Sequence, residues 1–346
     1  MPPPQHTTAA WYGPDLAGCP KEWSLQLEPF HVEELETAAR TAMATYGDDL
    51  AAITSQGFPL PHLEPLLLSL RQQLLHGFGF SLIRGLLVER YTQREAATLF
   101  YGLGSHLGHA RSQNAAGHIL GHVRDVGKAS TDTDVRIYQT HERQTFHTDS
   151  ADVVGLLCLK QSKSGGESLL VSAVTIYNEF LNRRPDLLPR LFDPVGTDRR
   201  GEVPVGMAPF FEIPVFSWFA GCLSVMYQRQ YIDSAQRFPK AMRLTSEHVE
   251  ALDLFDSLAN DPALSFSMKL QPGDMQFVYN HSLLHDRMGF EDWAEPERRR
   301  HLLRLWLSTP GDRPLPDCFA QRFGSTDIGD RGGIVVPGMT LTAPVE

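Results

Sequence analysis

The chain has 346 residues, of which 42% are hydrophobic and 21% charged, a balance typical of folded globular proteins. Its formal net charge of −10 argues against nucleic acid or an anionic membrane as a main partner, because both attract basic surfaces. No apolar stretch approaches the roughly 20 residues needed to span a bilayer, so we expect no membrane partner.

The cysteines and the N-terminal residues indicate the cellular compartment. The four cysteines are scattered and form no CxxC pair, which is typical of reduced thiols in the cytosol. These are Cys19, Cys158, Cys222 and Cys318. The stretch MPPPQHTTAAWYG lacks the basic and apolar segments of a secretory signal, so we expect a cytoplasmic protein.

Helices dominate the first part of the chain. Residues 1–28 are rich in Pro, Gly and Trp and predict an arm that lies on the body of the protein. Good helix formers that end at a glycine predict helices over 31–47 and 61–77. A short buried strand is expected within FGFSLIRGL, and the helix after it begins with a capping box formed by Thr92 and Glu95.

Short strands dominate the rest. Residues 105–134 are polar and predict a long loop, a feature that is often functional in a compact domain. Extended chain is expected over 135–146, and an alternating segment over 223–232. Further strands and helices follow from apolar runs and helix formers: strands at 151–160, LLVSA, PGDMQFVYN and HLLRLWLS, and helices at 173–183 and around 246–259. Early helices followed by many short strands predict a β-sandwich or jelly roll with helices packed outside.

A histidine two residues before a carboxylate occurs four times. The pairs are His31 with Glu33, His62 with Glu64, His147 with Asp149, and His248 with Glu250. In a helix, side chains two residues apart point about 200° apart and cannot share a metal ion, whereas in a strand they point to the same face. Only His147 and Asp149 follow an extended segment, so they form the candidate metal clamp. The other three pairs are interpreted as solvated helix faces.

A two-histidine, one-carboxylate metal site needs a second histidine from a distant strand. His285 in NHSLLHDRMGF is the best candidate, because it follows the strand expected over Met275–Tyr279. His281 competes with it on sequence alone. A role in the core or beside the site is the alternative for either histidine.

The segment RRRHLLRLWLS predicts a strand with inward arginines. Alternation places Arg300, Leu302, Arg304 and Trp306 on one face. Two arginines on a mainly apolar strand are costly to bury unless they meet anions, and a guanidinium fork suits a carboxylate. The alternative is a pair of surface arginines on an edge strand.

Five segments together resemble one family. In order and spacing, FHTDS, SGGES, PGDMQF, NHSLLHDR and RRRHLLRLWLS are similar to the taurine dioxygenase (TauD/TfdA-like) family of iron(II)- and 2-oxoglutarate-dependent oxygenases. The resemblance implies an α/β fold with a mainly β core, the double-stranded β-helix or jelly roll of clavaminate-synthase type with flanking helices. We therefore expect a single oxygenase domain over 1–346, with the arm over 1–28, a catalytic core over about 70–325, and a tail over 326–346.

The resemblance implies a metal site and a reaction. His147, Asp149 and His285 match the facial triad that holds iron(II), with 2-oxoglutarate and O2 as cosubstrates and no catalytic residue beyond the metal site. Oxidation of an unactivated C–H bond in a small acid or amino-acid-like substrate then accompanies decarboxylation of 2-oxoglutarate to succinate and CO2. Related halogenases lack the carboxylate of Asp149, so hydroxylation is the expected outcome. Oxidative cyclisation of aziridine type and desaturation use the same triad and stay open.

The resemblance also implies ligands for the cosubstrate and the substrate. Arg300 matches the arginine that pairs with the distal carboxylate of 2-oxoglutarate, and Ser168 stands where many members have an assisting threonine. Arg304 matches a second inward arginine that faces the cosubstrate or an acidic group of the substrate. Tyr138 and Gln144, just upstream of the clamp, are candidates for substrate contact. The 105–134 loop is the expected lid.

The sequence differs from the taurine-cleaving members of the family in two places, and two other classes of protein stay open as alternatives. The stretch YQTHERQTF and the link from His285 to Arg300 differ from the taurine-cleaving members, which weakens any inference to taurine. A non-catalytic jelly roll that binds a ligand and a zinc hydrolase are the alternatives, although zinc alone leaves Arg300 unexplained. A homo-oligomer also stays open.

Overall fold

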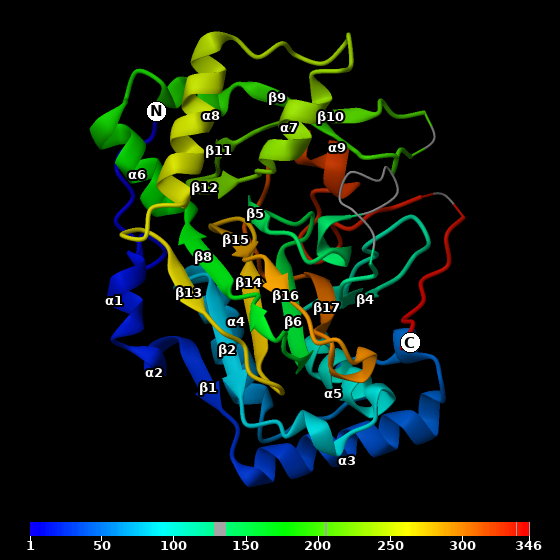
Figure 1. The fold of residues 1–346 in the computed structure, drawn as a ribbon. Helices are drawn as coiled ribbons and strands as arrows, with labels where there is room; N and C mark the ends of the chain where they lie inside the picture. Colours follow the sequence, from blue (N-terminus) through cyan, green and yellow to red (C-terminus); the bar gives the residue numbers. More distant parts are fainter. Residues whose placement is uncertain (128–135, 205, 337, 346) are drawn as a thin grey trace.

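Two facing β-sheets form the centre of the computed structural model, which describes residues 1–127, 136–204, 206–336 and 338–345 (Figure 1). The larger sheet has seven strands within these ranges, in the order β1 (Ser24–Gln26), β2 (Phe80–Arg84), β14 (Met275–Tyr279), β6 (Val153–Lys160), β17 (His301–Ser308) and β3 (His109–Ala110), with β4 (Leu120–Val123) also paired to β17. All its pairings are antiparallel except that of β1 with β2.

The smaller sheet carries the strands that lead into the predicted metal clamp. Its four antiparallel strands follow the order β13 (Phe266–Met268), β8 (Ser168–Ser172), β15 (Leu283–Arg287) and β5 (Gln144–His147). Three short two-stranded ribbons complete the described strands: β9 (Pro194–Asp198) with β10 (Phe210–Pro214), β11 (Phe216–Phe219) with β12 (Cys222–Val225), and β7 (Ser164–Gly165) with β16 (Phe290–Glu291).

Alternation of side chains explains why the larger sheet is covered on both faces. On β17, Leu303, Leu305 and Leu307 join the core formed with the early helices, while Leu302 and Trp306 join a second core with side chains of the smaller sheet. The early helices are α3 (Pro29–Tyr46), α4 (Glu64–His76) and α5 (Gln93–Ser105). The two faces expected for this strand are therefore confirmed.

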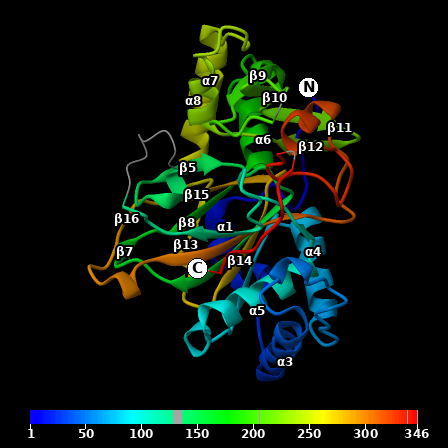
Figure 2. The same cartoon turned by 90° about the vertical axis from the view of Figure 1, so that its right-hand side faces the viewer.

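The later helices gather at the opposite end of the molecule. Figures 1 and 2 place α6 (Ala173–Arg183), α7 (Arg229–Ala235) and α8 (Ser246–Ala259) with β9–β12, away from α3. The helices predicted over 173–183 and around 246–259 are confirmed, as are those within 31–47 and 61–77. Among the described residues, no helix combines the length and the apolar character needed to cross a membrane.

The N-terminal arm packs on the body, as expected. It contains α1 (Gly13–Ala17), α2 (Pro20–Trp23) and β1. Trp11 and Trp23 are buried against Phe80 of β2, and the Trp11 indole N–H donates to the Phe78 carbonyl at 2.8 Å. These aromatic anchors attach the arm to the edge of the larger sheet.

Two capping motifs show how local sequence sets helix starts. In α5 the predicted capping box is present, with the Thr92 N–H donating to Glu95 at 2.8 Å and the Glu95 N–H donating back to Thr92 Oγ1 at 3.2 Å. His31 and His248, interpreted above as solvated, are instead buried at the third positions of α3 and α8. Their rings accept backbone N–H groups at the helix start, at 3.1 Å for His31 and 3.3 Å for His248. Capping therefore accounts for their burial.

Three other expectations were wrong in part. The predicted 105–134 loop contains β3 and β4, because the exposed edge of β17 supplies backbone partners that outweigh local polarity; residues 128–134 lie outside the described residues. Extended chain was expected over 135–146, but the described part of this stretch contains a 3-10 turn at Ile137–Gln139, and β5 follows it. The alternating 223–232 stretch divides into most of β12 and the first turn of α7.

A buried charge network holds the start of β6 against the C-terminal segment. Arg331, with no exposed side-chain surface, donates to Asp152 at 2.8 Å and to Asp312 at 2.7 Å. His281 Nε2 lies 2.9 Å from the same Asp152, and Tyr279 donates to Asp312. His281 therefore belongs to this network and not to the predicted clamp. Because Asp152 lies three residues after Asp149, the network also fixes the backbone that carries the clamp.

Removing the arginine from this network should destabilise the fold strongly. Arg331→Met leaves two buried carboxylates without their cation, and we expect a loss of about 3–5 kcal/mol in the free energy of unfolding. Urea denaturation measures this loss. The matched control is Arg183→Met, which breaks a half-exposed ion pair with Glu179 and should cost under about 1 kcal/mol. Equal losses for both variants would show that the network contributes no more than a surface pair.

Candidate metal centre and its two cavities

Strand pairing brings the two predicted histidines together. His147 at the end of β5 lies directly opposite His285 in β15, and their ring centroids are 4.2 Å apart. Asp149 follows β5 by two residues, and its backbone N–H donates to Asn280 Oδ1 at 2.9 Å. The extended backbone expected for the clamp is therefore fixed by a residue at the β14–β15 turn.

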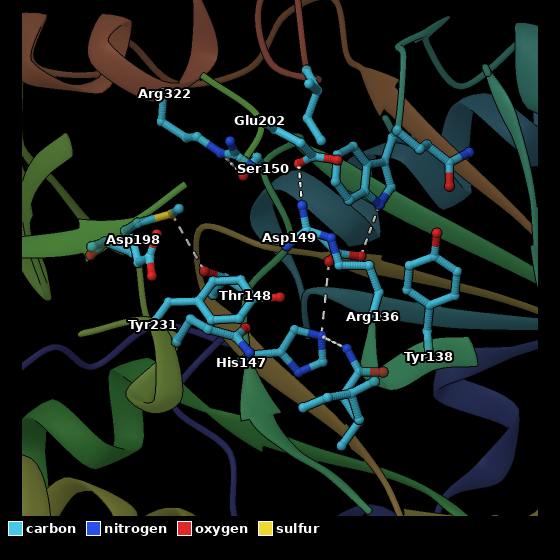
Figure 3. Close-up of a pocket in the computed structure, with 18 of the residues that line it drawn as sticks. Arg136, Tyr138, His147, Thr148, Asp149, Ser150, Asp198, Glu202, Tyr231 and Arg322 are labelled. Atoms are coloured by element: carbon cyan, nitrogen blue, oxygen red, sulfur yellow. Dashed lines mark hydrogen bonds and ion pairs between the residues drawn. The ribbon is translucent and has the colours of Figure 1, made fainter. Parts of the chain in front are cut away.

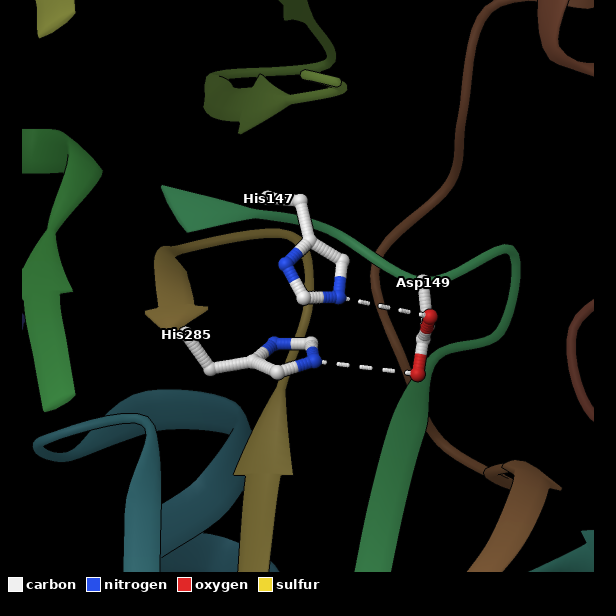
Figure 4. A group of neighbouring side chains, drawn as sticks. All are labelled: His147, Asp149 and His285. Carbon is white, nitrogen blue, oxygen red and sulfur yellow. Dashed lines mark ion pairs between the residues drawn. The ribbon is translucent and has the colours of Figure 1, made fainter. Parts of the chain in front are cut away.

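The three side chains converge on one point (Figure 4). His147 Nε2 lies 3.8 Å from Asp149 Oδ1, and His285 Nε2 lies 3.7 Å from Asp149 Oδ2. One ligand atom from each residue lies within 4.8 Å of the other two. Two imidazole nitrogens and one carboxylate oxygen on one side of a space are the donor set of non-haem iron(II) sites. The residues present therefore fit iron(II).

Hydrogen bonds select the tautomer that a metal requires. His147 Nδ1 lies 2.8 Å from the Thr145 carbonyl, which can only accept, so Nδ1 carries the proton and the Nε2 lone pair points to the clamp. The Gln144 amide nitrogen lies 2.8 Å from that Nε2 and donates to it. A bound metal ion would take the place of this amide as the partner of Nε2. Gln144 therefore borders the metal position.

Electrostatics favour metal-ready protonation states. Burial, reinforced by the nearby His285, lowers the pKa of His147 to about 3, so its imidazole is neutral at physiological pH. Burial would raise the pKa of Asp149, but Arg304 and the two histidines hold it well below its usual range. A neutral imidazole and an ionised carboxylate bind a cation without first releasing a proton.

Two side chains of β17 orient Asp149. The Trp306 indole N–H donates to Asp149 Oδ2 at 2.8 Å, and Arg304 Nη1 lies 3.8 Å from the same oxygen. Arg304 is itself held by Gln113, whose Oε1 accepts from Nε at 2.7 Å, and its guanidinium lies 4.5 Å from the centre of the Tyr138 ring. The alternation of β17 thus delivers both a donor and a positive charge to the clamp.

Removing the indole donor tests this arrangement. Trp306→Phe keeps an aromatic ring but removes the hydrogen bond to Asp149, and loss of such a supporting bond typically weakens metal binding by about 10–100-fold. Anaerobic equilibrium dialysis with iron(II) measures the affinity. The exposed Trp218→Phe on β11 is the matched control and should bind as the unaltered chain does. Unchanged affinity in Trp306→Phe would show that the indole does not support the metal site.

One cavity beside the clamp has the character of a carboxylate site. About 510 Å³ of space is lined by Ser168, Arg287, Leu302, Arg300 and others. Arg300 is buried, and its Nη1 has no hydrogen-bond partner among the described residues. Burial lowers the pKa of Arg300 to about 10, and the pKa of the neighbouring Arg287 to about 9. An unsatisfied buried guanidinium N–H is costly unless an anion binds it, so this cavity fits the carboxylate of 2-oxoglutarate.

A second cavity adjoins the first (Figure 3). Its volume, including space open to solvent, is about 700 Å³, and its lining includes polar and charged side chains from several separate segments: Arg136, Asp198, Glu202, Tyr231 and Arg322. The two cavities share Tyr138, Gln144, His147, Asp149 and Arg304. The clamp thus lies where two cavities with different linings meet.

The structure gathers all the residues expected at the site and adds others. Arg300, Ser168 and His285 line the first cavity alone, where the Ser168 hydroxyl donates to Gln276 at 2.9 Å. Arg287 of the first cavity and Arg136, Glu202 and Arg322 of the second cavity were not foreseen. No motif marks these side chains, because each comes from a different segment and only the fold brings them together. Trp306 could have been found, since it shares the strand face of Arg304.

Comparison with known families shows which family the chain belongs to. The family described as "Taurine catabolism dioxygenase TauD, TfdA family" matches residues 45–306. The chain belongs to this family. It is therefore an oxidoreductase of the iron(II)- and 2-oxoglutarate-dependent dioxygenase type, built on the double-stranded β-helix. The cofactor expectations drawn from FHTDS and RRRHLLRLWLS are confirmed.

Individual family members extend the comparison. The chain is 35% identical over 304 residues to FR-33289 synthase of Streptomyces rubellomurinus, covering 85% of this chain and 88% of that protein. It is 31% identical over 323 residues to the taurine hydroxylase-like protein SAT17 of Stachybotrys chartarum, covering 87% and 81%. Asparagine oxygenase, solved with Fe(II), hydroxyasparagine and succinate, superposes with a TM-score of 0.63 at 17% identity over 82% of this chain and 93% of that one. This likeness shows a shared fold.

Proposed function

We propose that this TauD-family dioxygenase hydroxylates an unactivated C–H bond of a small acid or amino-acid-like substrate, with His147, Asp149 and His285 as the iron ligands. The observation that carries the proposal is that two cavities, each lined by arginine, meet at His147 and Asp149, with His285 in the first of them. One cavity takes the cosubstrate and the other takes the substrate. When bound, the iron supplies O2 activation coupled to decarboxylation of 2-oxoglutarate to succinate and CO2.

The chain's own residues bind and orient the cosubstrate. Arg300 grips its distal carboxylate with the guanidinium edge that otherwise has an unpaired Nη1. Ser168 lines the same cavity, and its hydroxyl is available to assist this carboxylate by turning from Gln276. Leu302 and Val154 supply apolar walls that exclude water from the cosubstrate chain.

The substrate assignment rests on the second cavity and on the relatives. Its lining carries both positive and negative side chains, which suits a small polar molecule. The names of two matches refer to a sulfonate, taurine, and to an amino acid, asparagine, each of which bears an acidic group. Tyr138 and Gln144 face both cavities and are the substrate contacts we assign nearest to the metal.

Product analysis tests the proposed reaction. The iron-loaded protein is incubated with 2-oxoglutarate, isotopically labelled O2 and a panel of amino acids, carboxylates, sulfonates and phosphate esters. Hydroxylation predicts that one compound gains a single labelled oxygen atom in step with succinate formation. A product that has lost two hydrogens and gained no oxygen would contradict hydroxylation and indicate desaturation or ring closure by the same residues.

A further inference from the structure

Among the described residues that line the substrate cavity, every charged side chain except one has an ion-pair partner. Glu202 forms an ion pair with Arg136, whose Nη2 lies 2.9 Å from Oε2. Asp198 forms an ion pair with Arg237, whose Nη2 lies 3.0 Å from Oδ2. Asp149 faces the metal position, with Arg304 and the Trp306 indole beside it. The carboxylates of this cavity therefore already have their partners.

Arg322 is the cation without such a partner. It lies in the short helix α9 (Ala320–Phe323) and enters the cavity beside the clamp (Figure 3). Its Nε donates to Ser150 Oγ at 2.7 Å, and its guanidinium carbon lies 5.6 Å from the centre of the Phe211 ring. No ion pair joins it to a carboxylate in the part of the chain that the structure describes. Burial lowers the pKa of Arg322, and the nearby carboxylates of Glu202 and Asp149 offset this effect only in part.

Arg304, the arginine expected to meet the substrate, is already engaged. Its Nε donates to Gln113, its backbone carbonyl accepts from the same glutamine at 2.8 Å, and its guanidinium is packed between the Tyr138 and Trp306 rings. These contacts hold it beside Asp149, where it acts as a positioning residue. The terminal nitrogens of Arg322 have no comparable set of contacts, so they are available to a ligand.

We propose that Arg322 binds the anionic group of the prime substrate and thereby makes the enzyme selective for acids. This inference rests on the proposed function. It adds to that function the residue that binds the acidic group of the substrate and the type of interaction, an oxyanion held by the guanidinium of Arg322. Arg322 donates a hydrogen bond to Ser150, the neighbour of Asp149, and lines the same cavity as His147 and Asp149. An oxyanion bound by Arg322 is therefore held in the cavity that contains these two metal ligands.

Binding of simple oxyanions tests the proposal without turnover. The probes are acetate, methanesulfonate and methylphosphonate, with acetamide as the neutral control and sodium chloride to keep the ionic strength constant. Thermal unfolding of the full chain at increasing probe concentration reports binding, because a ligand that binds only the folded state raises Tm. Comparison of the rise in Tm with the three probes shows whether a carboxylate, a sulfonate or a phosphonate is preferred.

Arg322→Gln should lower the apparent affinity for the preferred oxyanion by about 10-fold or more, as expected for loss of a charged hydrogen bond. Arg322→Lys should restore part of it. The Arg300→Lys variant shows how much of the rise in Tm comes from oxyanion binding in the cosubstrate cavity. Arg183→Gln, which changes a half-exposed arginine, is the surface control. An oxyanion response that is absent from the unaltered chain, or equal in Arg322→Gln, overturns the proposal.

Two further readouts separate ligand binding from a structural role. Without ligand, Arg322→Gln should melt at or above the Tm of the unaltered chain, because a partly buried cation with no ion pair is removed; a clear drop in Tm would indicate that Arg322 is structural. The 2-oxoglutarate concentration for half-maximal succinate formation should not change. If the iron-loaded chain consumes no 2-oxoglutarate, the proposed function fails; if it does but Arg322→Gln keeps its oxyanion response, only the role of Arg322 fails.

Discussion

Replacing His147 or Asp149 by alanine is expected to abolish 2-oxoglutarate turnover while the chain stays folded. The two residues supply two of the three ligand atoms that converge within 4.8 Å, and removal of either one breaks the two-histidine, one-carboxylate set that iron(II) needs for this reaction. Their other side-chain contacts are few: His147 is hydrogen-bonded to Thr145 and Gln144, and Asp149 accepts from Trp306 and lies 3.8 Å from Arg304, which Gln113 also holds. The fold should therefore lose little.

Succinate formation and bound iron are measured together for each variant, with far-ultraviolet circular dichroism to check folding. His62→Ala is the matched control, since His62 is exposed and also precedes a carboxylate by two residues. It should turn over 2-oxoglutarate at the normal rate. Turnover retained in either clamp variant would show that the metal lies elsewhere.

Arg300→Lys is expected to raise the 2-oxoglutarate concentration for half-maximal turnover by about 10–100-fold. A lysine keeps the charge but replaces a two-pronged guanidinium with a single ammonium, which removes at least one charged hydrogen bond to the carboxylate. The effect should be large because Arg300 is buried and its Nη1 has no hydrogen-bond partner among the described residues.

The adjacent Arg299→Lys provides the control for this experiment. Arg299 is exposed and donates only to the carbonyls of Trp293 and Ala294, at 3.2 and 3.3 Å. Its replacement should leave the dependence on 2-oxoglutarate unchanged. An Arg300→Lys variant with the same dependence as Arg299→Lys would refute the role given to Arg300.

The parts of the site that the sequence predicted are those governed by backbone period. In extended chain His147 and Asp149 must face the same way, and in β17 alternation puts Arg304 and Trp306 on one face. Both statements need only local geometry. The partner histidine needed more: the sequence favoured His285 but left His281 as a competitor, and the β5–β15 pairing and the Asp152 network separate the two.

The parts that were missed depend on tertiary contacts. Strand β4 has a polar sequence and exists because the edge of β17 offers it partners. Glu202 and Arg322 are far apart in the chain and meet only across the second cavity. His31 and His248 looked like exposed helix residues, but each ring serves as a cap at a helix start. Local pattern carries no information about such long-range contacts, and the usual capping-box pattern, which the sequence did show at Thr92 and Glu95, has Glu or Gln and not His at the third helical position.

The most direct test of the central claim is succinate release from 2-oxoglutarate by protein loaded anaerobically with iron(II) and then exposed to air, across a panel of amino acids and small organic acids. Succinate formation should require iron and should rise with one acidic compound. This rise should be lost in Asp149→Ala. A loaded protein that neither binds nor consumes 2-oxoglutarate would contradict the account, and His147, Asp149 and His285 would then have to serve a purely binding or hydrolytic site.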